Sequence, residues 1–519
     1  MLVANLAGVL LLSRTDQAAI VRLLQLAFVI AVLVFLVRVF RRGPYKLRQR
    51  VPLDMTALPW ATWMQRPFLG WARSWWGGSS WVVGTDGDTT GVVGPHGSGK
   101  TFGVLIPQLL LWGGPAVSTS TKPDVIRATA GRRWRLAEET GGRIHVYAPT
   151  AGPDELVEGL RPIRWSPLAG CQDTRVATLR VDALVNTAQV SRGVEDPTHW
   201  RAGAARVLRP YFLAAAHHPV RPGDLTVVHD WLTRREFDEP LAILEGLNTF
   251  DGDQWAAGLR GVADTPPREL GSFFSAAENA LAATADPKVL RSTMATDLDP
   301  VEFLTTRSTL YIVSPSEHQV VVAPLISALV ESIVVAAYDL HRAGRLDRRL
   351  LLSLDEIANI APLPSLGSIA SQGTSQGVNL SWAAQSVAQL RERYGPDMAY
   401  AIWSESTAKV VFGGLADAPL LNDLSSLIGE RLVTLRGSSS SWMFGRQRTK
   451  TRMYRPRVTP AELAQFRQGW ALLLYRPARA FAIRVPIAPR RLAFRRALLP
   501  WPAPAPAAQQ APLTTTEGA

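Results

Sequence analysis

Eight consecutive residues fit the phosphate-binding pattern G-x-x-x-x-G-K-[ST], and they are Gly94, Pro95, His96, Gly97, Ser98, Gly99, Lys100 and Thr101. Glycines let a backbone curl so that successive N–H groups and a helix N-terminus point at the phosphates of a nucleotide. In such a loop Lys100 would reach the β- and γ-phosphates, and the Thr101 hydroxyl would hold Mg²⁺. Together with Phe102, which opens the following helix, the stretch predicts a nucleotide-binding site. A glycine-rich turn without a ligand is the alternative.

A second group of polar residues follows an apolar run, Leu350 to Leu354, which ends in Asp355 and Glu356. In a phosphate-loop protein, Asp355 would position the Mg²⁺ shell and Glu356 would orient or deprotonate the attacking water. Gln385 ends the next predicted strand, where it could touch the γ-phosphate or the water and report the nucleotide state to the following helix. The alternatives are a common strand-to-loop transition and an amide bonded to its own loop.

Short apolar runs alternate with helix-like segments around these residues. The runs predict strands at 90–93, 116–120, 143–147, 308–313, 350–354 and 378–384, with a helix at 102–111. Such alternation favours a parallel sheet with helices on its faces. Residues from about 180 to 300 are helix-like throughout, with segments such as 198–217 and 270–283. They predict an all-α domain inserted into the α/β domain.

The N-terminal region contains a 23-residue, mostly apolar stretch at 18–40 that can span a bilayer if its arginines snorkel toward the interfaces. Basic residues follow directly, which by the positive-inside rule places the rest of the chain in the cytoplasm. We expect a single-pass protein of the inner (plasma) membrane; a cleaved signal peptide is the alternative. The tryptophans at 60, 63, 71, 75, 76 and 81 predict either a juxtamembrane collar or ordinary core packing.

The composition limits the partners and the ions. The chain has 519 residues, 47% of them hydrophobic, enough for two or three domains with a sizeable core. A net charge of +13 favours a polyanionic partner, either nucleic acid or anionic lipid. The single cysteine, Cys171, excludes an internal disulfide and a cysteine-based zinc site. Mg²⁺ is the one ion that we expect.

The segment from Gly94 to Arg133 resembles the nucleotide-binding segment of conjugative type IV coupling proteins, the TraG/TraD group of the HerA/FtsK motor superfamily. The likeness covers about residues 85 to 485, in the order found in that family. Its further matches are Thr121-Lys122-Pro123-Asp124, Trp165-Ser166-Pro167-Leu168, Trp200, Asp355-Glu356, Ala384-Gln385-Ser386 and Thr459-Pro460-Ala461-Glu462-Leu463.

The resemblance implies a RecA-like P-loop NTPase domain with an inserted all-α domain and an N-terminal transmembrane helix. It implies a homo-hexameric ATPase that binds ATP and Mg²⁺, docks a relaxase-bound single DNA strand or secreted protein substrates at a type IV secretion channel, and drives their transfer. Two alternatives are an FtsK-type double-stranded DNA translocase and a membrane receptor with a mainly regulatory ATP site. The implied division is an apolar segment (1–17), the span (18–40), a basic tryptophan-rich segment (41–85), the nucleotide-binding domain (86–180 and 301–490), the all-α insertion (181–300) and a flexible tail (491–519).

Three departures from the family pattern are visible. Ser120-Thr121-Lys122-Pro123 lacks the acidic residue that many members carry before Pro-Lys-Gly. Gln372-Gly373-Thr374 stands where some relatives have an arginine that reaches a neighbour's nucleotide, so Arg391 and Arg393 are the candidates for an arginine finger. The family usually shows two membrane spans, whereas one is clear here.

One basic region lies outside all of these motifs. The glycine-serine run at 437–441 and the basic residues Arg446, Arg448, Lys450 and Arg452 predict a mobile basic loop. Such a loop is either solvated or touches DNA phosphates.

Overall fold

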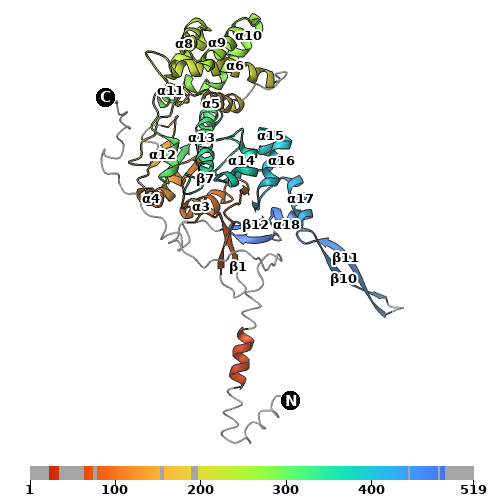
Figure 1. Cartoon of the computed structure of the whole chain (residues 1–519). Helices are drawn as coiled ribbons and strands as arrows, with labels where there is room; N and C mark the ends of the chain where they lie inside the picture. The colour runs from red at the N-terminus through yellow and green to blue at the C-terminus, as the bar shows by residue number, and fades with distance from the viewer. Residues whose placement is uncertain are drawn as a thin grey trace, which may run out of the picture.

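The computed structural model describes residues 23–33, 64–73, 79–151, 157–188, 197–441, 445–476 and 480–485. An 11-stranded sheet forms the centre of this part of the chain (Figure 1). Its strands are β1 (Phe68–Arg73), β2 (Ser79–Val83), β3 (Thr90–Val93), β4 (Ala116–Ser120), β5 (Ile144–Tyr147), β6 (Thr309–Val313), β7 (Leu350–Leu354), β8 (Val378–Ala384), β9 (Ala408–Phe412), β12 (Trp470–Tyr475) and β13 (Phe481–Arg484).

The sheet has a parallel part and an antiparallel extension, in the order β2-β1-β13-β12-β9-β3-β8-β7-β4-β6-β5. The strands from β9 to β5 pair in parallel, and β12, β13, β1 and β2 add antiparallel partners at one side. Strands predicted at 90–93, 116–120, 350–354 and 378–384 have those bounds, and the two predicted at 143–147 and 308–313 begin one residue later. The antiparallel strands and β9 were not predicted.

The central strands β3, β4, β7 and β8 are buried on both faces, as is usual for parallel strands covered by helices. On β7, Leu350, Leu352 and Leu354 join the largest core cluster, whereas Leu351 packs with residues of α3 and α4 on the other face. The helices between the strands are η1 (Thr101–Leu105), α3 (Ile106–Leu111), α4 (Asp124–Glu138), α13 (Gln319–Arg342), α14 (Leu366–Gln372), η4 (Gly373–Gln376), α15 (Val387–Tyr394), α16 (Pro396–Glu405), α17 (Ala418–Ile428) and α18 (Pro460–Ala464). The helix predicted at 102–111 thus starts with the π-helical turn η1.

Between β5 and β6 the described residues form helices and no strand. The helices are α5 (Thr174–Thr187), α6 (Pro197–Ala216), α7 (Leu225–Arg234), α8 (Asp238–Gly246), α9 (Phe250–Ala263), α10 (Pro267–Ala280), η3 (Ala282–Ala285), α11 (Pro287–Ser292) and α12 (Pro300–Thr305). Most of these helices, among them α6, α8, α9 and α10, gather above the sheet in Figure 1, with α13 running up from the sheet to meet them, whereas α12 lies lower, near α4. Buried Arg180 of α5 connects this helical group to α13, because its Nη1 donates to the carbonyl of Ala328 on α13 at 2.9 Å.

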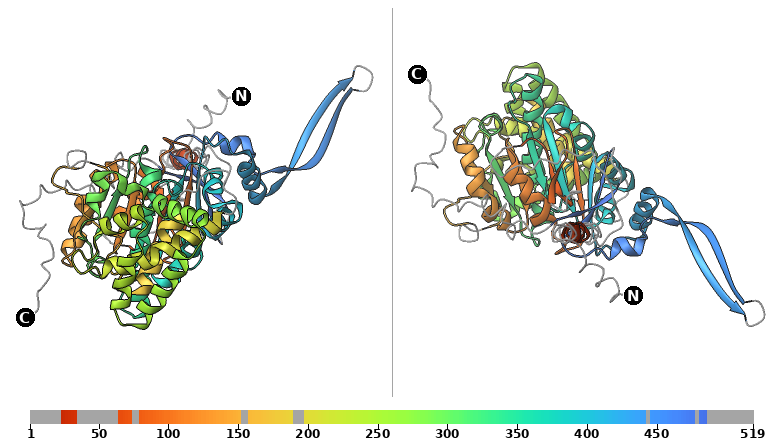
Figure 2. Two further views of the ribbon diagram at one scale, coloured as in Figure 1. Left: turned by 90° about the horizontal axis from the view of Figure 1, so that it is seen from above. Right: turned by 90° about the horizontal axis from the view of Figure 1, so that it is seen from below.

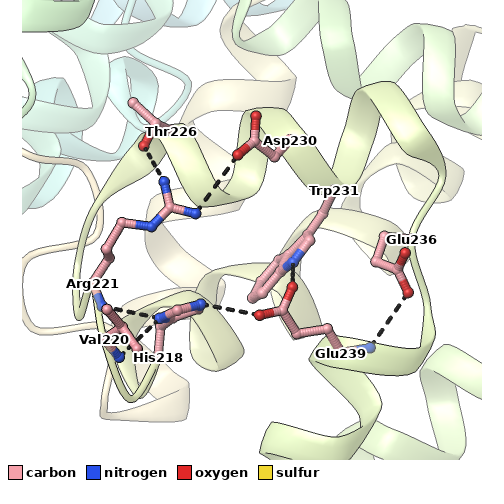
Figure 3. A network of polar contacts seen from close by, with 8 residues as sticks. All are labelled: His218, Val220, Arg221, Thr226, Asp230, Trp231, Glu236 and Glu239. Carbon is pink, nitrogen blue, oxygen red and sulfur yellow. Dashed lines mark hydrogen bonds and ion pairs between the residues drawn. The ribbon is translucent and has the colours of Figure 1, made fainter.

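A polar network fixes the turn between α6 and α7 against α8 (Figure 3). His218 is buried, and its Nδ1 accepts hydrogen bonds from the backbone of Val220 and Arg221 at 3.2 and 3.0 Å. The proton of a neutral ring therefore sits on Nε2, which lies 3.1 Å from Glu239 Oε1. Trp231 Nε1 donates to the second oxygen of Glu239 at 2.8 Å, and this hydrogen bond is the main cause of the lowered pKa of that carboxyl. The network satisfies polar groups inside the helical layer.

The predicted membrane span at 18–40 lies mostly outside the described residues. Its described part, residues 23–33, is an apolar helix. Within the described ranges, α13 alone is long and apolar enough to cross a membrane, with a mean hydropathy of 2.3, but 67% of its apolar window is buried in the protein. Its position between the sheet and α5 identifies it as a core helix.

Two of the clustered tryptophans are placed by the structure. Trp71 on β1 is 3% exposed and stacks edge-on against Phe68 at 4.8 Å, and Trp81 on β2 packs against the same cluster. Of the two predictions for these residues, core packing is therefore correct for Trp71 and Trp81. The other four tryptophans lie outside the described residues.

The prediction of a mobile basic loop near 437–452 is wrong. β10 (Glu430–Ser441) and β11 (Gly445–Pro456) form an antiparallel ribbon with continuous register from Glu430↔Pro456 to Ser441↔Gly445. Strands tolerate serine and arginine when alternate positions face solvent, so a polar composition did not exclude a strand. Figures 1 and 2 show the ribbon projecting from the body beside α17.

Candidate nucleotide-binding site

The phosphate loop connects β3 to the helix that begins at Thr101. Gly97 and Gly99 have φ angles of +75° and +100°, a region that other L-residues rarely adopt. Gly94 must be small for a different reason, because a Cβ atom there would lie 2.7 Å from Phe412 Cβ. The loop geometry therefore depends on glycine at the positions where the sequence has it.

Lys100 folds back over this loop and is 7% exposed. Its Nζ donates to the carbonyl oxygens of Gly94 at 2.6 Å and Pro95 at 3.1 Å. Burial lowers the pKa of the ammonium group, and the charges of Asp355 and Glu356 oppose that shift. A cation held only by carbonyl oxygens and by nearby carboxylates can exchange these partners for phosphate oxygens.

Thr101 and Asp355 meet although they are 254 positions apart in the sequence. The Thr101 hydroxyl donates to Asp355 Oδ2 at 2.5 Å. Burial raises the pKa of the Asp355 carboxyl, while the Thr101 hydrogen bond and the Lys100 charge act in the opposite direction. Thr119 on β4 donates from its Oγ1 to the Asp355 carbonyl at 2.9 Å, which fixes the end of β7.

Glu356 has a left-handed backbone, with φ of 48°. Hydrogen bonds on both sides hold this conformation. Glu356 N donates to Asp355 Oδ1 at 3.1 Å, Ile357 N donates to Ala383 O at 3.1 Å, and Ile360 N donates to Glu356 O at 3.1 Å. Its half-buried side chain lies within 3.4 Å of Gln385 Nε2, measured from Glu356 Oε1. A strained backbone that is held at both ends fixes the direction of one side chain, as is common at functional sites.

The site collects the carboxyl ends of neighbouring strands. β3 leads to Lys100 and Thr101, β8 leads to Gln385, and β7 leads to Asp355 and Glu356, and these strands are adjacent in the order β3-β8-β7. Ligands of open α/β sheets bind at this edge. The structure therefore brings the predicted catalytic and metal-binding residues into one place.

The residues present fit a nucleotide phosphate and Mg²⁺. Ser98 Oγ is buried inside the loop and has no hydrogen-bond partner there. The helix starts at Thr101, and the Gly103 N–H in its first turn already donates to Gly99 O at 2.8 Å. The other N–H groups at a helix start lack intrahelical acceptors and can donate to an anion. The hydroxyl of Thr101 and the carboxylate of Asp355 are oxygen ligands of the kind that Mg²⁺ prefers.

Other candidates lie farther from this chemistry. The His96 side chain is exposed, and Phe102 is half-buried against the apolar cluster of α3 and α4. Arg393 donates from Nη2 to the carbonyl of Thr187, at the end of α5, at 2.6 Å. Arg391 is exposed on α15. Of the two arginine-finger candidates, only Arg391 thus has an exposed side chain.

Sequence reasoning missed two residues that position the site. One is Thr119, whose role depends on a contact between β4 and β7 that no sequence pattern reveals. The other is Gln389, whose Oε1 accepts from Gln385 N at 3.2 Å while its own N–H donates to the N-cap Ser386. The pattern Ser-x-x-Gln at a helix start is a signal that could have found Gln389.

Comparisons with known proteins agree with this geometry. The chain is 27% identical over 411 residues to a conjugal transfer protein TraG of Escherichia coli, which covers 71% of this chain and 60% of that protein. It is 22% identical over 414 residues to the TraG protein of Agrobacterium fabrum, with 77% of this chain and 61% of the relative covered. The chain therefore spans about three fifths of the length of these relatives.

Solved structures of the conjugative coupling protein TrwB share the fold. A trigonal form in complex with sulphate has a TM-score of 0.58 and 20% identity, covering 78% of this chain and 88% of that one. A complex of TrwB with ADP and Mg²⁺ has a TM-score of 0.54 and 20% identity over 80% of this chain and 90% of that one. The fold is thus a TrwB-like α/β P-loop NTPase fold with a large mixed sheet.

The sequence profile of one family, described as type IV secretory system conjugative DNA transfer, matches residues 54–485. This range includes the phosphate loop, the ends of β7 and β8, and the helical layer. The chain belongs to the family of conjugative DNA transfer proteins of type IV secretory systems.

Proposed function

We propose that this protein is an ATPase that recruits a relaxase-bound single DNA strand, or protein substrates, to a type IV secretion channel and powers their transfer. The hydrogen bond between Thr101 and Asp355 carries the proposal, because it joins the phosphate loop to the carboxylate pair. Membership of the conjugative DNA transfer family supports the choice of process.

The side chains have distinct tasks in this proposal. The loop N–H groups and Lys100 would bind the phosphates, and Thr101 and Asp355 would hold Mg²⁺, which when bound would offset the negative charge of the phosphate oxygens. Glu356 accepts a proton from, or orients, the attacking water. Gln385 contacts Glu356 and leads into α15, so it can pass a change at the phosphate to that helix.

The finer architecture is also part of the proposal. Residues 86–180 and 301–490 act as a RecA-like domain, residues 181–300 as an inserted all-α domain, and residues 18–40 as a single membrane anchor with the ATPase on the cytoplasmic side of the inner membrane. The active form is a homo-hexamer. The apolar helix at 23–33 supports the anchor, and the run of helices between β5 and β6 supports the insertion.

The test is ATP hydrolysis by the full chain in lipid nanodiscs, with no DNA, with single-stranded DNA and with duplex DNA. Lys100→Ala serves as the blank. Stimulation by single strands is the expected result. Stimulation by duplex alone would favour an FtsK-type translocase, and ATP binding without hydrolysis under all conditions would favour a receptor with a regulatory ATP site.

A further inference from the structure

The β10–β11 ribbon carries a strong positive charge outside the nucleotide site. Between residues 430 and 457 the sequence has one acidic residue, Glu430, and eight basic ones: Arg431, Arg436, Arg446, Arg448, Lys450, Arg452, Arg455 and Arg457. All described side chains on the two strands are exposed except that of Val433, which is half-buried. A two-stranded ribbon without a second layer is marginally stable in water, so an exposed one of this length calls for a partner.

The register sorts the charges by face. Residues two apart on a strand share a face, and directly opposed residues share it too. Arg446, Arg448, Lys450 and Arg452 therefore occupy one face, opposite Ser440, Ser438, Arg436 and Thr434. Only Arg431 and Arg455, a directly opposed pair, lie on the other face of the strands. We call the first group with Arg436 the cationic face.

The cationic face has a linear spacing. Positions two apart on an antiparallel strand are about 7 Å apart, so the four basic positions of β11 extend over roughly 20 Å. The residues on β10 that lie opposite these four positions are two serines, a threonine and Arg436, and none of them is acidic. Like charges at opposed positions, here Arg436 and Lys450, destabilise a sheet. The ribbon keeps this row of cations although their repulsion destabilises it. Their linear spacing suits binding to a linear polyanion.

An aromatic side chain continues the same face toward the body. Tyr454 follows Lys450 and Arg452 at the same two-residue spacing, and its side chain is 68% exposed. An exposed ring in line with phosphate-binding cations is the arrangement by which proteins stack the bases of single-stranded nucleic acid. A duplex keeps its bases stacked on each other and offers no base face to such a ring.

The ribbon is anchored firmly at its base. Arg457 N donates to Gly429 O at 2.9 Å, and the buried Ser425 Oγ on α17 donates to Val458 O at 2.7 Å. Thr459 and Glu462 then form a capping box that starts α18. The base of the arm thus belongs to the body, while β10 and β11, which carry the cationic face, project away from it (Figure 2).

We propose that the cationic face of the β10–β11 ribbon, with Tyr454, is a binding surface for single-stranded DNA. The proposal depends on the proposed function only for the choice of DNA as the cargo. It adds a DNA-contact surface that lies outside the nucleotide site and is argued independently of it.

The test compares two double variants that each remove two positive charges from the ribbon. Lys450→Thr/Arg452→Thr changes the cationic face, and Arg431→Thr/Arg455→Thr changes the other face. Binding of fluorescent dT30 to the full chain in nanodiscs of neutral lipid is measured by anisotropy between 50 and 200 mM salt. We expect the first variant to bind about tenfold more weakly and to flatten the slope of log K against log salt by about 1.4, because each lost phosphate contact contributes about 0.7.

Tyr454→Leu tests the stacking contact, with Tyr400→Leu as its control because Tyr400 is 71% exposed on α16, away from the ribbon. We expect Tyr454→Leu to weaken binding about tenfold with an unchanged salt slope. Equal losses for both double variants, or no loss for either, would overturn the proposal. So would a loss confined to a 30-base-pair duplex or to vesicles containing phosphatidylserine.

The outcome is separable from that of the proposed function. ATP hydrolysis without DNA uses residues of the sheet edge only, so each ribbon variant should hydrolyse ATP at the wild-type rate. Normal dT30 binding by Lys450→Thr/Arg452→Thr would reject this surface and leave the ATPase proposal intact. Failure of the wild-type chain to hydrolyse ATP would reject the ATPase proposal and leave the dT30 comparison valid.

Discussion

The nucleotide site and the β10–β11 ribbon hold their cations in opposite ways. Lys100 is 7% exposed, and two carbonyl oxygens fix its position. Lys450 is exposed, and the register sets it opposite Arg436. A buried cation works in one fixed position, because the free-energy cost of removing its water must be offset by specific hydrogen-bond or charge partners. Exposed cations act through their number and spacing, so each single one should matter less.

Removing one lysine from each region should give the largest difference between the two. Lys100→Ala should lower ATP hydrolysis by at least about 10²-fold, because the positioned charge at the phosphates is lost. Lys450→Thr should leave hydrolysis without DNA unchanged. Steady-state phosphate release measures both. Similar rates for the two variants would remove the distinction, and Lys288→Ala, on exposed α11, controls for the loss of a lysine elsewhere.

Glu356→Gln tests how sharply the buried site depends on one proton acceptor. The amide has the same shape and the same left-handed backbone cost, so nucleotide binding should be retained. Hydrolysis should fall by roughly 10²- to 10⁴-fold if the carboxylate orients or deprotonates water. Single-turnover measurements with prebound ATP separate the two effects. Wild-type hydrolysis by this variant would reassign the role. The control is Glu138→Gln, whose side chain is exposed at the end of α4.

Arg133→Met extends the comparison to stability. Arg133 is fully buried, and its guanidinium donates to Thr309 Oγ1 at 2.8 Å and to the carbonyl oxygens of Trp112 and Gly114 at 2.5 and 2.6 Å. Burial lowers its pKa to about 10. Without these donors two buried carbonyls stay unsatisfied, and unfolding should need about 3 kcal/mol less. Denaturant unfolding measures this; an unchanged midpoint would contradict it, and Arg268→Met, on the exposed surface of α10, is the control.

The smallest expected effect is on the stability of the ribbon. Arg431 and Arg455 are exposed and directly opposed on β10 and β11. Replacing both with threonine removes a like-charge pair and adds good strand formers, so the strands should gain up to about 1 kcal/mol. Hydrogen exchange of the amides of β10 and β11 measures the local change. Faster exchange in the variant would show that the pair is stabilised by something other than its own strands.

The same contrast explains what the sequence could predict. Buried parallel strands such as β7 and β8 are short apolar runs with polar ends, so their bounds and the convergence of Lys100, Asp355 and Gln385 could be predicted. β9, β12 and β13 were missed, although β12 and β13 lie close together in the sequence and pair directly. The ribbon was misassigned because its glycine and serine content suggests a loop, although Arg446, Arg448, Lys450 and Arg452 alternate with a period of two.

The sequence showed which residues belong to the site more readily than it showed which way their side chains point. Asp355 and Glu356 are neighbours in the sequence, yet one turns toward Thr101 and the other toward Gln385. The left-handed backbone of Glu356 separates them, and it depends on hydrogen bonds from Ile357 and Ile360 that form only in the folded protein. Residue type identified the pair, and tertiary structure assigned each member its direction.

The firmly held base of the ribbon makes it a lever. Twelve residues per strand give an arm of about 41 Å. Its fulcrum lies where Ser425 and Arg457 hold the strands to the body. By simple trigonometry on that strand rise, tilting α17 by about 10° would sweep the far end through roughly 7 Å. A small rearrangement beside the sheet would therefore be magnified at the end of the arm into a step comparable with the spacing of its own cations.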